Sequence, residues 1–205
     1  MVKTPEFEHA KEYSLNRLKN ELSPLLIYHN PEHTLNDVVP AAERLASLEK
    51  VEDDDRFLLL TAAYYHDLGF VRLRQGHEAV SIEIAEQILP QFGYSDVQIM
   101  VIRGVIQATC IPQSPTNLLE RIMADADLDY LGRGNFWERS KDLRLELENF
   151  GEKFTDKDWY IYQLRFIQSH QYFTVSERML RDGKKQQHLL EIQHQLDEAI
   201  LLKRT

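Results

Sequence analysis

Two histidines and two aspartates, spread over three segments of the chain, have the side chains needed to hold a divalent metal ion. His33 stands in one segment, and His66 and Asp67 are adjacent in a second. The third segment offers a choice between Asp125 and Asp127. Imidazole and carboxylate ligands together suit Mn, Fe, Ni, Co or Zn better than Ca, which prefers oxygen ligands alone. Four protein ligands on an ion that accepts five or six leave room for a water or a substrate oxygen, which is typical of a catalytic site.

The order and context of these residues resemble a known family. The two histidines, Asp67 and Asp127 are similar to the ligand set of the HD superfamily of metal-dependent phosphohydrolases. The resemblance extends over about residues 25–132 and implies an all-helical fold with its metal-binding core in this range. Residues from about 135 to 203 would then form C-terminal helices that complete the core and the wall of the pocket.

A second motif overlaps the first ligand. The segment from Tyr28 to His33 reads Tyr-His-Asn-Pro-Glu-His. It resembles the signature of cyclic-nucleotide phosphodiesterases and of several uncharacterised bacterial HD proteins. In those phosphodiesterases the second residue of the motif is the general acid and the sixth is a metal ligand. By position, the resemblance implies that His29 is the general acid and that His33 binds the metal.

The last ligand requires a choice within one short segment. Residues 122–127 read Ile-Met-Ala-Asp-Ala-Asp, which matches the family's lead-in to its final aspartate and favours Asp127. Asp125 is the alternative ligand. Asp129 is interpreted as a solvated or capping carboxylate.

The residues between Asp67 and Asp127 depart from the pattern of dinuclear HD enzymes, which add histidine ligands there. His77 could serve as one such ligand, but Gln107-Ala108-Thr109 stands where another histidine is expected. The sequence therefore predicts one tightly held ion, with a second, weaker Mg or Mn as an alternative. If a carboxylate base is needed, Glu78 is the nearest candidate. A role as a helix-start cap beside His77 explains this residue equally well.

Apolar residues recur at helical spacing along most of the chain, so helices must position these side chains. One helix is predicted to start near Phe7, a second to cover 34–50, a third to run from Asp53 to near Gly69, and a fourth to run from His77 to Pro90. Further helices are predicted after Ser95, over 118–126, and after Thr155 as far as His170. The final stretch of the chain is predicted to form the last helix. Pro40 must lie in the first turn of its helix or kink it. His66 and Asp67 are expected in the last turn of theirs. Without a period-two strand pattern, the sequence predicts a single compact all-α domain.

Length, charge and cysteine content narrow the functional classes. A chain of 205 residues can bury a substantial core as one domain. Its 24 basic and 33 acidic residues argue against non-specific nucleic-acid binding, which needs a basic surface. Cys110 is the only cysteine, so no intrachain disulfide can form. No signal peptide or membrane-spanning stretch is evident, and a cytoplasmic location is expected.

The resemblance implies hydrolysis of a phosphate ester of a nucleotide or a similar small molecule by a metal-activated water. Phosphodiester and phosphomonoester substrates stay open. The alternative is a metal-binding but non-catalytic module that senses nucleotides. Four cations could contact a phosphate, although a solvated surface position is the simpler interpretation of each: Arg72, Arg74, Lys184 and Lys185. No nucleic-acid or membrane partner is expected, and the final helix could pack on the core or form a homodimer interface.

Overall fold

The computed structural model of the protein describes residues 5–201, and this part is built from nine α-helices joined by loops and short helical turns. The elements are α1 (Phe7–Glu21), the π-helical turn η1 (His33–Val38), α2 (Val39–Leu48), α3 (Asp53–Tyr65), the 3-10 turn η2 (Leu68–Val71), α4 (His77–Ile88), the 3-10 turn η3 (Leu89–Phe92), α5 (Asp96–Gln107), α6 (Leu118–Asp127), the 3-10 turn η4 (Asp129–Gly132), α7 (Phe136–Asn149), α8 (Asp156–Ser169) and α9 (Val175–Leu201). No strand occurs in residues 5–201, so the predicted all-α fold is confirmed.

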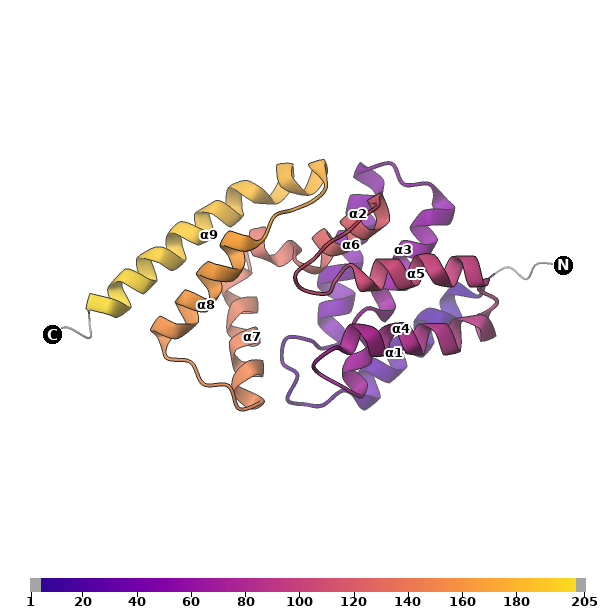
Figure 1. Ribbon diagram of the computed structural model, residues 1–205, viewed down its shortest axis with the longest axis horizontal. Helices are drawn as coiled ribbons and strands as arrows, with labels where there is room; N and C mark the ends of the chain where they lie inside the picture. The colour runs from indigo at the N-terminus through magenta and orange to yellow at the C-terminus, as the bar shows by residue number, and fades with distance from the viewer. Residues whose placement is uncertain (1–4, 202–205) are drawn as a thin grey trace.

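Two apolar clusters organise the helices. Helices α1 to α6 pack around the first cluster, and α7, α8 and α9 pack around the second, as the two ends of the molecule show in Figure 1. Tyr28 and the residues around η4 belong to the second cluster, although Tyr28 precedes α2 in the chain. The segments with the predicted metal ligands therefore lie close to the boundary between the clusters.

Side-chain caps fix several helix starts as the sequence predicts. Ser95 and Gln98 form a reciprocal capping box at the start of α5. The Thr155 hydroxyl accepts the backbone N–H of Asp158 at the start of α8. At the start of α9, the Thr174 hydroxyl accepts the backbone N–H of Glu177 at 3.1 Å. These bonds satisfy donors that the first helical turn cannot pair internally.

The predicted helix over residues 34–50 is interrupted near its start. Residues His33–Val38 form a π-helical turn, and the Val39 N–H bonds to the carbonyl of Thr34, five residues earlier. Pro40 follows in the first turn of α2, where its missing N–H costs little. The widened turn buries His33 and Asp37 on the inner side.

The end of α3 also differs slightly from the prediction. The helix ends at Tyr65, so His66 is its C-cap and Asp67 lies just beyond it, before η2. Gly69 in η2 packs directly against α4: a Cβ there would lie 1.9 Å from the His77 carbonyl oxygen. Its N–H donates to Ser81 Oγ at 2.7 Å, which fixes η2 on the same helix.

Helix α7, with its 14 residues from Phe136 to Asn149, was not predicted as a separate element. Its sequence places few apolar residues among many charged ones, which weakens the helical pattern. Among the helices described, none is long and apolar enough to span a membrane.

Candidate metal centre

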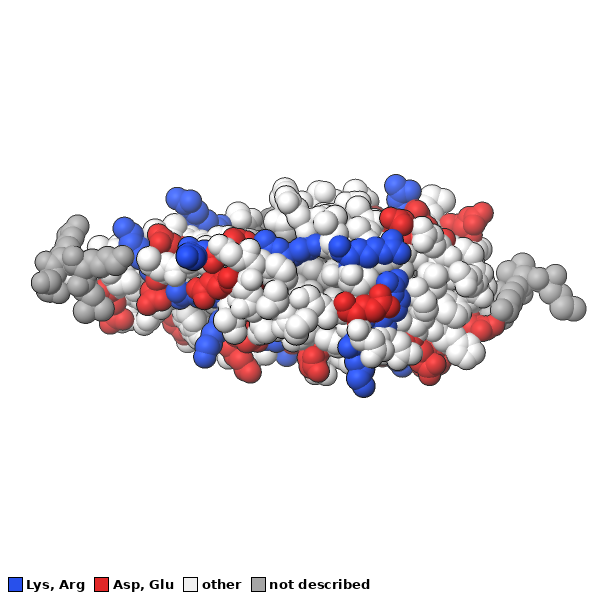
Figure 2. Space-filling model, turned by 90° about the horizontal axis from the view of Figure 1, so that it is seen from below, with Lys and Arg blue, Asp and Glu red and all other residues white. Residues whose placement is uncertain are grey.

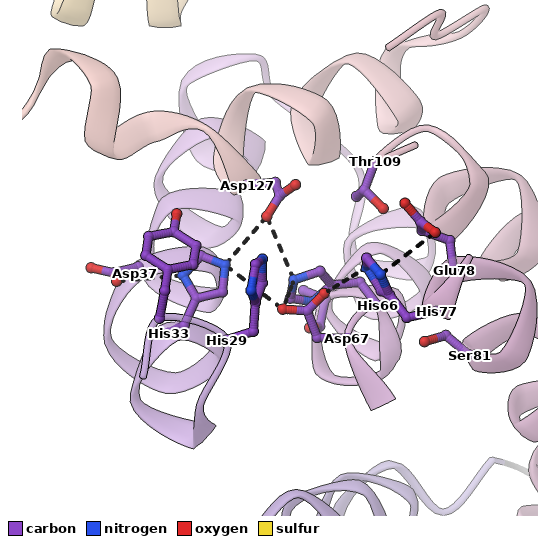
Figure 3. Close-up of polar contacts among 12 residues, drawn as sticks. His29, His33, Asp37, His66, Asp67, His77, Glu78, Ser81, Thr109 and Asp127 are labelled. Atoms are coloured by element: carbon purple, nitrogen blue, oxygen red, sulfur yellow. Dashed lines mark hydrogen bonds and ion pairs between the residues drawn. The ribbon is translucent and has the colours of Figure 1, made fainter. Parts of the chain in front are cut away.

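Three of the predicted ligands point to one spot between η1, the end of α3 and the end of α6 (Figure 3). His33 Nε2 lies 3.3 Å from Asp127 Oδ1, and His66 Nε2 lies 3.6 Å from the same oxygen. One ligand atom from each of these residues lies within 4.8 Å of the others, which is close enough for one ion to contact all three. Both imidazoles are buried, with 1% of their surface exposed.

Asp67 adds a fourth oxygen to this group. Its Oδ2 lies 3.2 Å from His66 Nε2 and 3.8 Å from His33 Nε2. Its other oxygen, Oδ1, lies 3.3 Å from His77 Nε2, so Asp67 stands between the three-residue group and His77. We refer to His33, His66, Asp67 and Asp127 as the metal cluster.

The orientation of His66 shows that the metal cluster attracts positive charge. His66 Nδ1 lies 2.8 Å from the carbonyl oxygen of Ala63, which can only accept, so Nδ1 donates a proton there. The remaining nitrogen, Nε2, faces carboxylate oxygens that also only accept. Either a second proton or a cation must lie between them. Among the described residues, His66 Nε2 and Asp67 Oδ2 are buried without a hydrogen-bond partner, and a metal ion would provide one for each.

The pKa shifts in the metal cluster have the same cause. Burial favours the neutral form of His66, but the carboxylates of Asp67 and Asp127 outweigh it and raise the pKa of His66 well above its usual value. Burial likewise works against the charged carboxyl of Asp127, yet hydrogen bonds to His33 and His66 leave its pKa below the usual value. Since metal binding requires neutral imidazoles and ionised carboxylates, a cation would take the place of these protons.

Asp37 supports His33 from behind. Its Oδ2 lies 3.5 Å from His33 Nδ1, on the side of the ring away from the metal cluster. Two arginines hold this carboxylate, Arg133 at 2.6 Å and Arg139 at 2.9 Å. Carboxylates placed in this way orient metal-binding imidazoles. No motif singled out Asp37 in the sequence, since only its position four residues after His33 relates the two residues.

Asp125, the alternative last ligand, serves a different purpose. Its carboxylate accepts the backbone N–H groups of Phe173 and Thr174 at 2.7 and 2.8 Å, and the Thr174 hydroxyl at 2.7 Å. Residues two apart on an α-helix project in nearly opposite directions, so Asp125 and Asp127 cannot face the same site. The structure therefore favours Asp127 as the ligand.

Asp129 is not solvated, contrary to expectation. It is 1% exposed and contacts Arg44 at 2.7 Å and Arg181 at 2.6 Å. Its carboxylate links η4 to α2 and α9.

His29, the predicted general acid, lies beside the metal cluster and is held by a carboxylate from α7. His29 Nδ1 is 2.5 Å from Glu146 Oε1, and the other oxygen of Glu146 accepts the backbone N–H groups of Tyr28 and His29 at 2.8 and 2.9 Å. Burial works against the charged form of Glu146, but these hydrogen bonds lower its pKa. Phe70 stacks on the imidazole, with 4.4 Å between the ring centroids. The sequence did not indicate Glu146, which lies in the helix that was not predicted.

Comparisons with known proteins agree with this arrangement. The family model described as HD domain matches residues 32–129. Residues 32–129 are therefore similar to an HD domain. The fold is similar to the crystal structure of a predicted HD superfamily hydrolase from an uncultured Thermotogales bacterium, with a TM-score of 0.63 and 18% sequence identity over 97% of this chain and 95% of that chain. A comparison with curated proteins gave no match.

Residues 32–129 form only part of the cavity beside the metal cluster. This cavity has a volume of about 190 Å³, and its polar lining residues are His29, Asp67, His77, Glu78, Thr109 and Asp127. Its apolar and aromatic lining includes Leu143, Tyr162 and Phe166, which come from α7 and α8. The cavity therefore combines residues from the range that matches the HD domain with residues from the C-terminal helices.

The region beyond Asp67 contains the residues considered for a second ion. His77 Nδ1 lies 3.1 Å from the Arg74 carbonyl oxygen and 3.6 Å from Glu78 Oε2, while Nε2 faces Asp67. Thr109, which stands where a further histidine was expected, lines the same cavity. Glu78 lies in the first turn of α4 and also lines the cavity.

None of the four cations considered for phosphate binding lines the metal cavity. Arg72 pairs with Glu83 at 3.0 Å, and Arg74 pairs with Glu152 at 3.2 Å. Lys184 contacts Gln187, and Lys185 is buried against the carbonyl of His170. On the face seen from below, basic and acidic side chains are interspersed, with several basic ones in a row across its middle (Figure 2).

Proposed function

We propose that this protein is a metal-dependent phosphohydrolase that cleaves a phosphate ester of a nucleotide or a similar small molecule. The observation that carries the proposal is that His29, which Glu146 holds, lines the same cavity as Asp67 and Asp127 of the metal cluster. A module that only binds metal has no need of a further imidazole, beyond the two in the metal cluster, that is held by a buried carboxylate. The HD domain supports membership of a family of metal-dependent hydrolases.

The donor set of the metal cluster fits a divalent transition metal ion, held by His33, His66, Asp67 and Asp127. Such an ion lowers the pKa of bound water and polarises a phosphoryl oxygen. A weaker second Mg or Mn would have His77 and Asp67 within reach, and we keep one tightly held ion as the proposal. Glu78 could accept a proton from the attacking water.

His29 supplies the acid for the leaving group. The Glu146 carboxylate can only accept, so His29 Nδ1 donates to it. When the ring is protonated, its other proton is on Nε2. As the bond between phosphorus and the leaving oxygen breaks, that oxygen takes the Nε2 proton, and the water oxygen forms the new bond to phosphorus. Phe70, stacked on the ring, limits its rotation.

The test compares metal content with turnover in the wild-type protein and three variants. Protein purified without added metal should contain about one transition-metal ion per chain and hydrolyse a phosphomonoester, a phosphodiester or a nucleotide. Asp67→Ala should lose the ion. His29→Ala should retain the ion and lower turnover by about 100-fold or more, the range for general acid catalysis. His194→Ala, at a side chain that is 70% exposed on α9, is the control and should behave as wild type.

Three results would contradict the proposal. Bound metal without turnover on any substrate would favour the non-catalytic nucleotide-sensing module. Failure to bind Mn, Fe, Ni, Co or Zn after reconstitution would exclude metal-dependent hydrolysis. Loss of metal in His29→Ala would show that His29 is a ligand and not the acid.

A further inference from the structure

A second hollow adjoins the metal cavity. It has a volume of about 150 Å³ and shares three wall residues with the metal cavity: Ile111, Leu128 and Phe166. The rest of its wall comes from the loop after α5, from the last residue of α8 and from the segment between α8 and α9. It consists of Pro112, Gln113, Ser169, His170, Gln171 and Phe173. We call this hollow the side pocket. Its wall contains no Asp, Glu, Lys or Arg, in contrast to the three carboxylates of the metal cavity.

The walls of the side pocket are held in place. Asp125 fixes the segment between α8 and α9 through three hydrogen bonds to Phe173 and Thr174. In the same segment, the Tyr172 hydroxyl donates to the Leu128 carbonyl at 3.3 Å. On the other wall, Gln113 Nε2 donates to the Ala124 carbonyl at 2.9 Å. A pocket anchored on both sides loses little freedom when a ligand enters, which favours binding.

His170 contributes a neutral ring with a defined proton. Lys185 Nζ, which can only donate, lies 3.3 Å from His170 Nδ1, so Nδ1 accepts and the ring proton is on Nε2. Burial, together with the nearby Lys185, lowers the pKa of His170 to about 3, which keeps the ring neutral near pH 7. Within the described residues, its Nε2 is buried without a hydrogen-bond partner.

Gln113 contributes the complementary group. Its amide nitrogen donates to the Ala124 carbonyl, and its Oε1 atom is a hydrogen-bond acceptor. The side pocket thus combines the aromatic rings of Phe166 and Phe173 with neutral hydrogen-bonding groups. Planar heterocycles are bound by such surfaces, because rings stack on aromatic side chains and neutral edges pair with neutral donors and acceptors.

We propose that the side pocket binds the uncharged, planar organic group of the substrate, a nitrogen heterocycle such as a nucleobase, while the phosphate lies at the metal cluster. The inference rests on the proposed function and names the part of the substrate that this function leaves open. Neither pocket wall contains Lys or Arg, so both disfavour a chain of further phosphates. Gln113, His170 and Phe173 are then specificity-determining residues.

Binding to the metal-loaded His29→Ala variant tests the inference without turnover. The probes for titration calorimetry are the four nucleoside 5′-monophosphates, their 3′,5′-cyclic counterparts, and ribose 5-phosphate, which has the phosphate but no base. At least one nucleotide should bind about 5-fold to 150-fold tighter than ribose 5-phosphate, the range expected for stacking one base on an aromatic side chain. Adding Phe173→Ala or Gln113→Ala should reduce this preference at least several-fold, whereas adding Gln193→Ala on the exposed side of α9 should not.

The outcomes separate this inference from the proposed function. Nucleotides that bind no tighter than ribose 5-phosphate would overturn the inference, as would a preference that survives both pocket substitutions. Unfolding temperatures within a few degrees of the parent variant show that the folds are intact, and Gln113→Ala, which removes no ring, serves if Phe173→Ala is unstable. A wild-type protein that binds nucleotides through the side pocket but hydrolyses none would contradict only the proposed function.

Discussion

At the level of single residues, Glu146 gives His29 its defined orientation. The imidazole side chain is 24% exposed, whereas the carboxylate that holds it is 2% exposed. Both oxygens of Glu146 are used, one by the ring and the other by two backbone N–H groups of residues 28 and 29. A buried carboxylate whose two oxygens both accept hydrogen bonds holds the loop and the ring together, so the position of the His29 ring does not depend on loop rigidity alone.

Glu146→Gln should lower kcat without loss of metal. The amide is similar in size to the carboxylate but carries no negative charge beside the His29 ring. We expect kcat to fall about 10-fold to 100-fold, as is common when the partner that orients a functional imidazole is removed. Rapid-quench kinetics and metal analysis on the same sample measure the two effects. A variant with wild-type kcat would show that the contact is only structural. Glu148→Gln, two residues further along α7 and paired with Arg144, is the control.

His170 should make stability depend on pH over a defined range. Its pKa is about 3 in the folded protein against a usual value of 6.5, so the unfolded chain binds a proton over this interval that the folded protein does not. The free energy of unfolding should therefore rise with pH from 3 to 6.5 and then level off, with a slope of at most about 1.4 kcal/mol per pH unit from this group.

Urea unfolding at pH 5 and pH 8 measures this contribution. His170→Asn should be less pH-dependent than wild type, because the substituted side chain does not titrate. The comparison uses the change with pH, since the lost ring contacts affect both measurements alike. An equal change in both proteins would show that His170 can be protonated in the fold.

At the level of elements, the metal cluster depends on where regular helices stop. The π-helical turn, the end of α3 and the end of α6 each place a ligand at a helix terminus. Helix η2 then turns the chain so that Gly69 lies against the backbone of α4, beside His77. These contacts leave no room for a side chain, so the distance between Asp67 and His77 depends on this glycine.

Gly69→Ala should destabilise the fold and disturb the metal cluster. The new methyl group would lie 1.9 Å from the His77 carbonyl oxygen and 2.9 Å from the Ser81 nitrogen, both of which are backbone atoms. Forcing α4 away should cost about 1–3 kcal/mol of unfolding free energy, the usual range for overpacking. Gly134→Ala is the matched control, because a Cβ there meets no atom within 4 Å. Thermal unfolding and metal affinity measure both consequences; equal values for the two variants would contradict the prediction.

At the level of the whole molecule, the sequence predicted the helices and the residues of the metal cluster better than the contacts between distant segments. His33, His66, Asp67 and Asp127 could be found because metal binding requires their side-chain types. The choice between Asp125 and Asp127 depends on which of the two side chains faces the site from their helix. A family motif favoured Asp127, but residue type could not decide between two aspartates. Glu146 lies more than a hundred residues after His29 in a mostly charged helix, so nothing local relates the two. Such long-range pairs follow from packing of the two clusters.

The packing of the final helix also could not be decided from its sequence. Its spacing fitted either the core or a homodimer interface, and in the structure Ile192 and Leu196 are buried in the second cluster, with Leu189 and Ile200 packed against it. These residues therefore cover the protein's own core. A homodimer through another surface stays a prediction, as does the cytoplasmic location.

The position of the cavity on the boundary between the two clusters has an evolutionary consequence. The residues of the metal cluster lie in the range that matches the HD domain, while Leu143, Tyr162 and Phe166 of the cavity lining come from α7 and α8. Under the proposed function, mutations in α7 and α8 can alter which molecule fits without changing the metal cluster, as long as position 146 keeps its carboxylate. We therefore expect relatives with a similar metal cluster to diverge in what they act on, and a chimera with another relative's last three helices to show that relative's preferences.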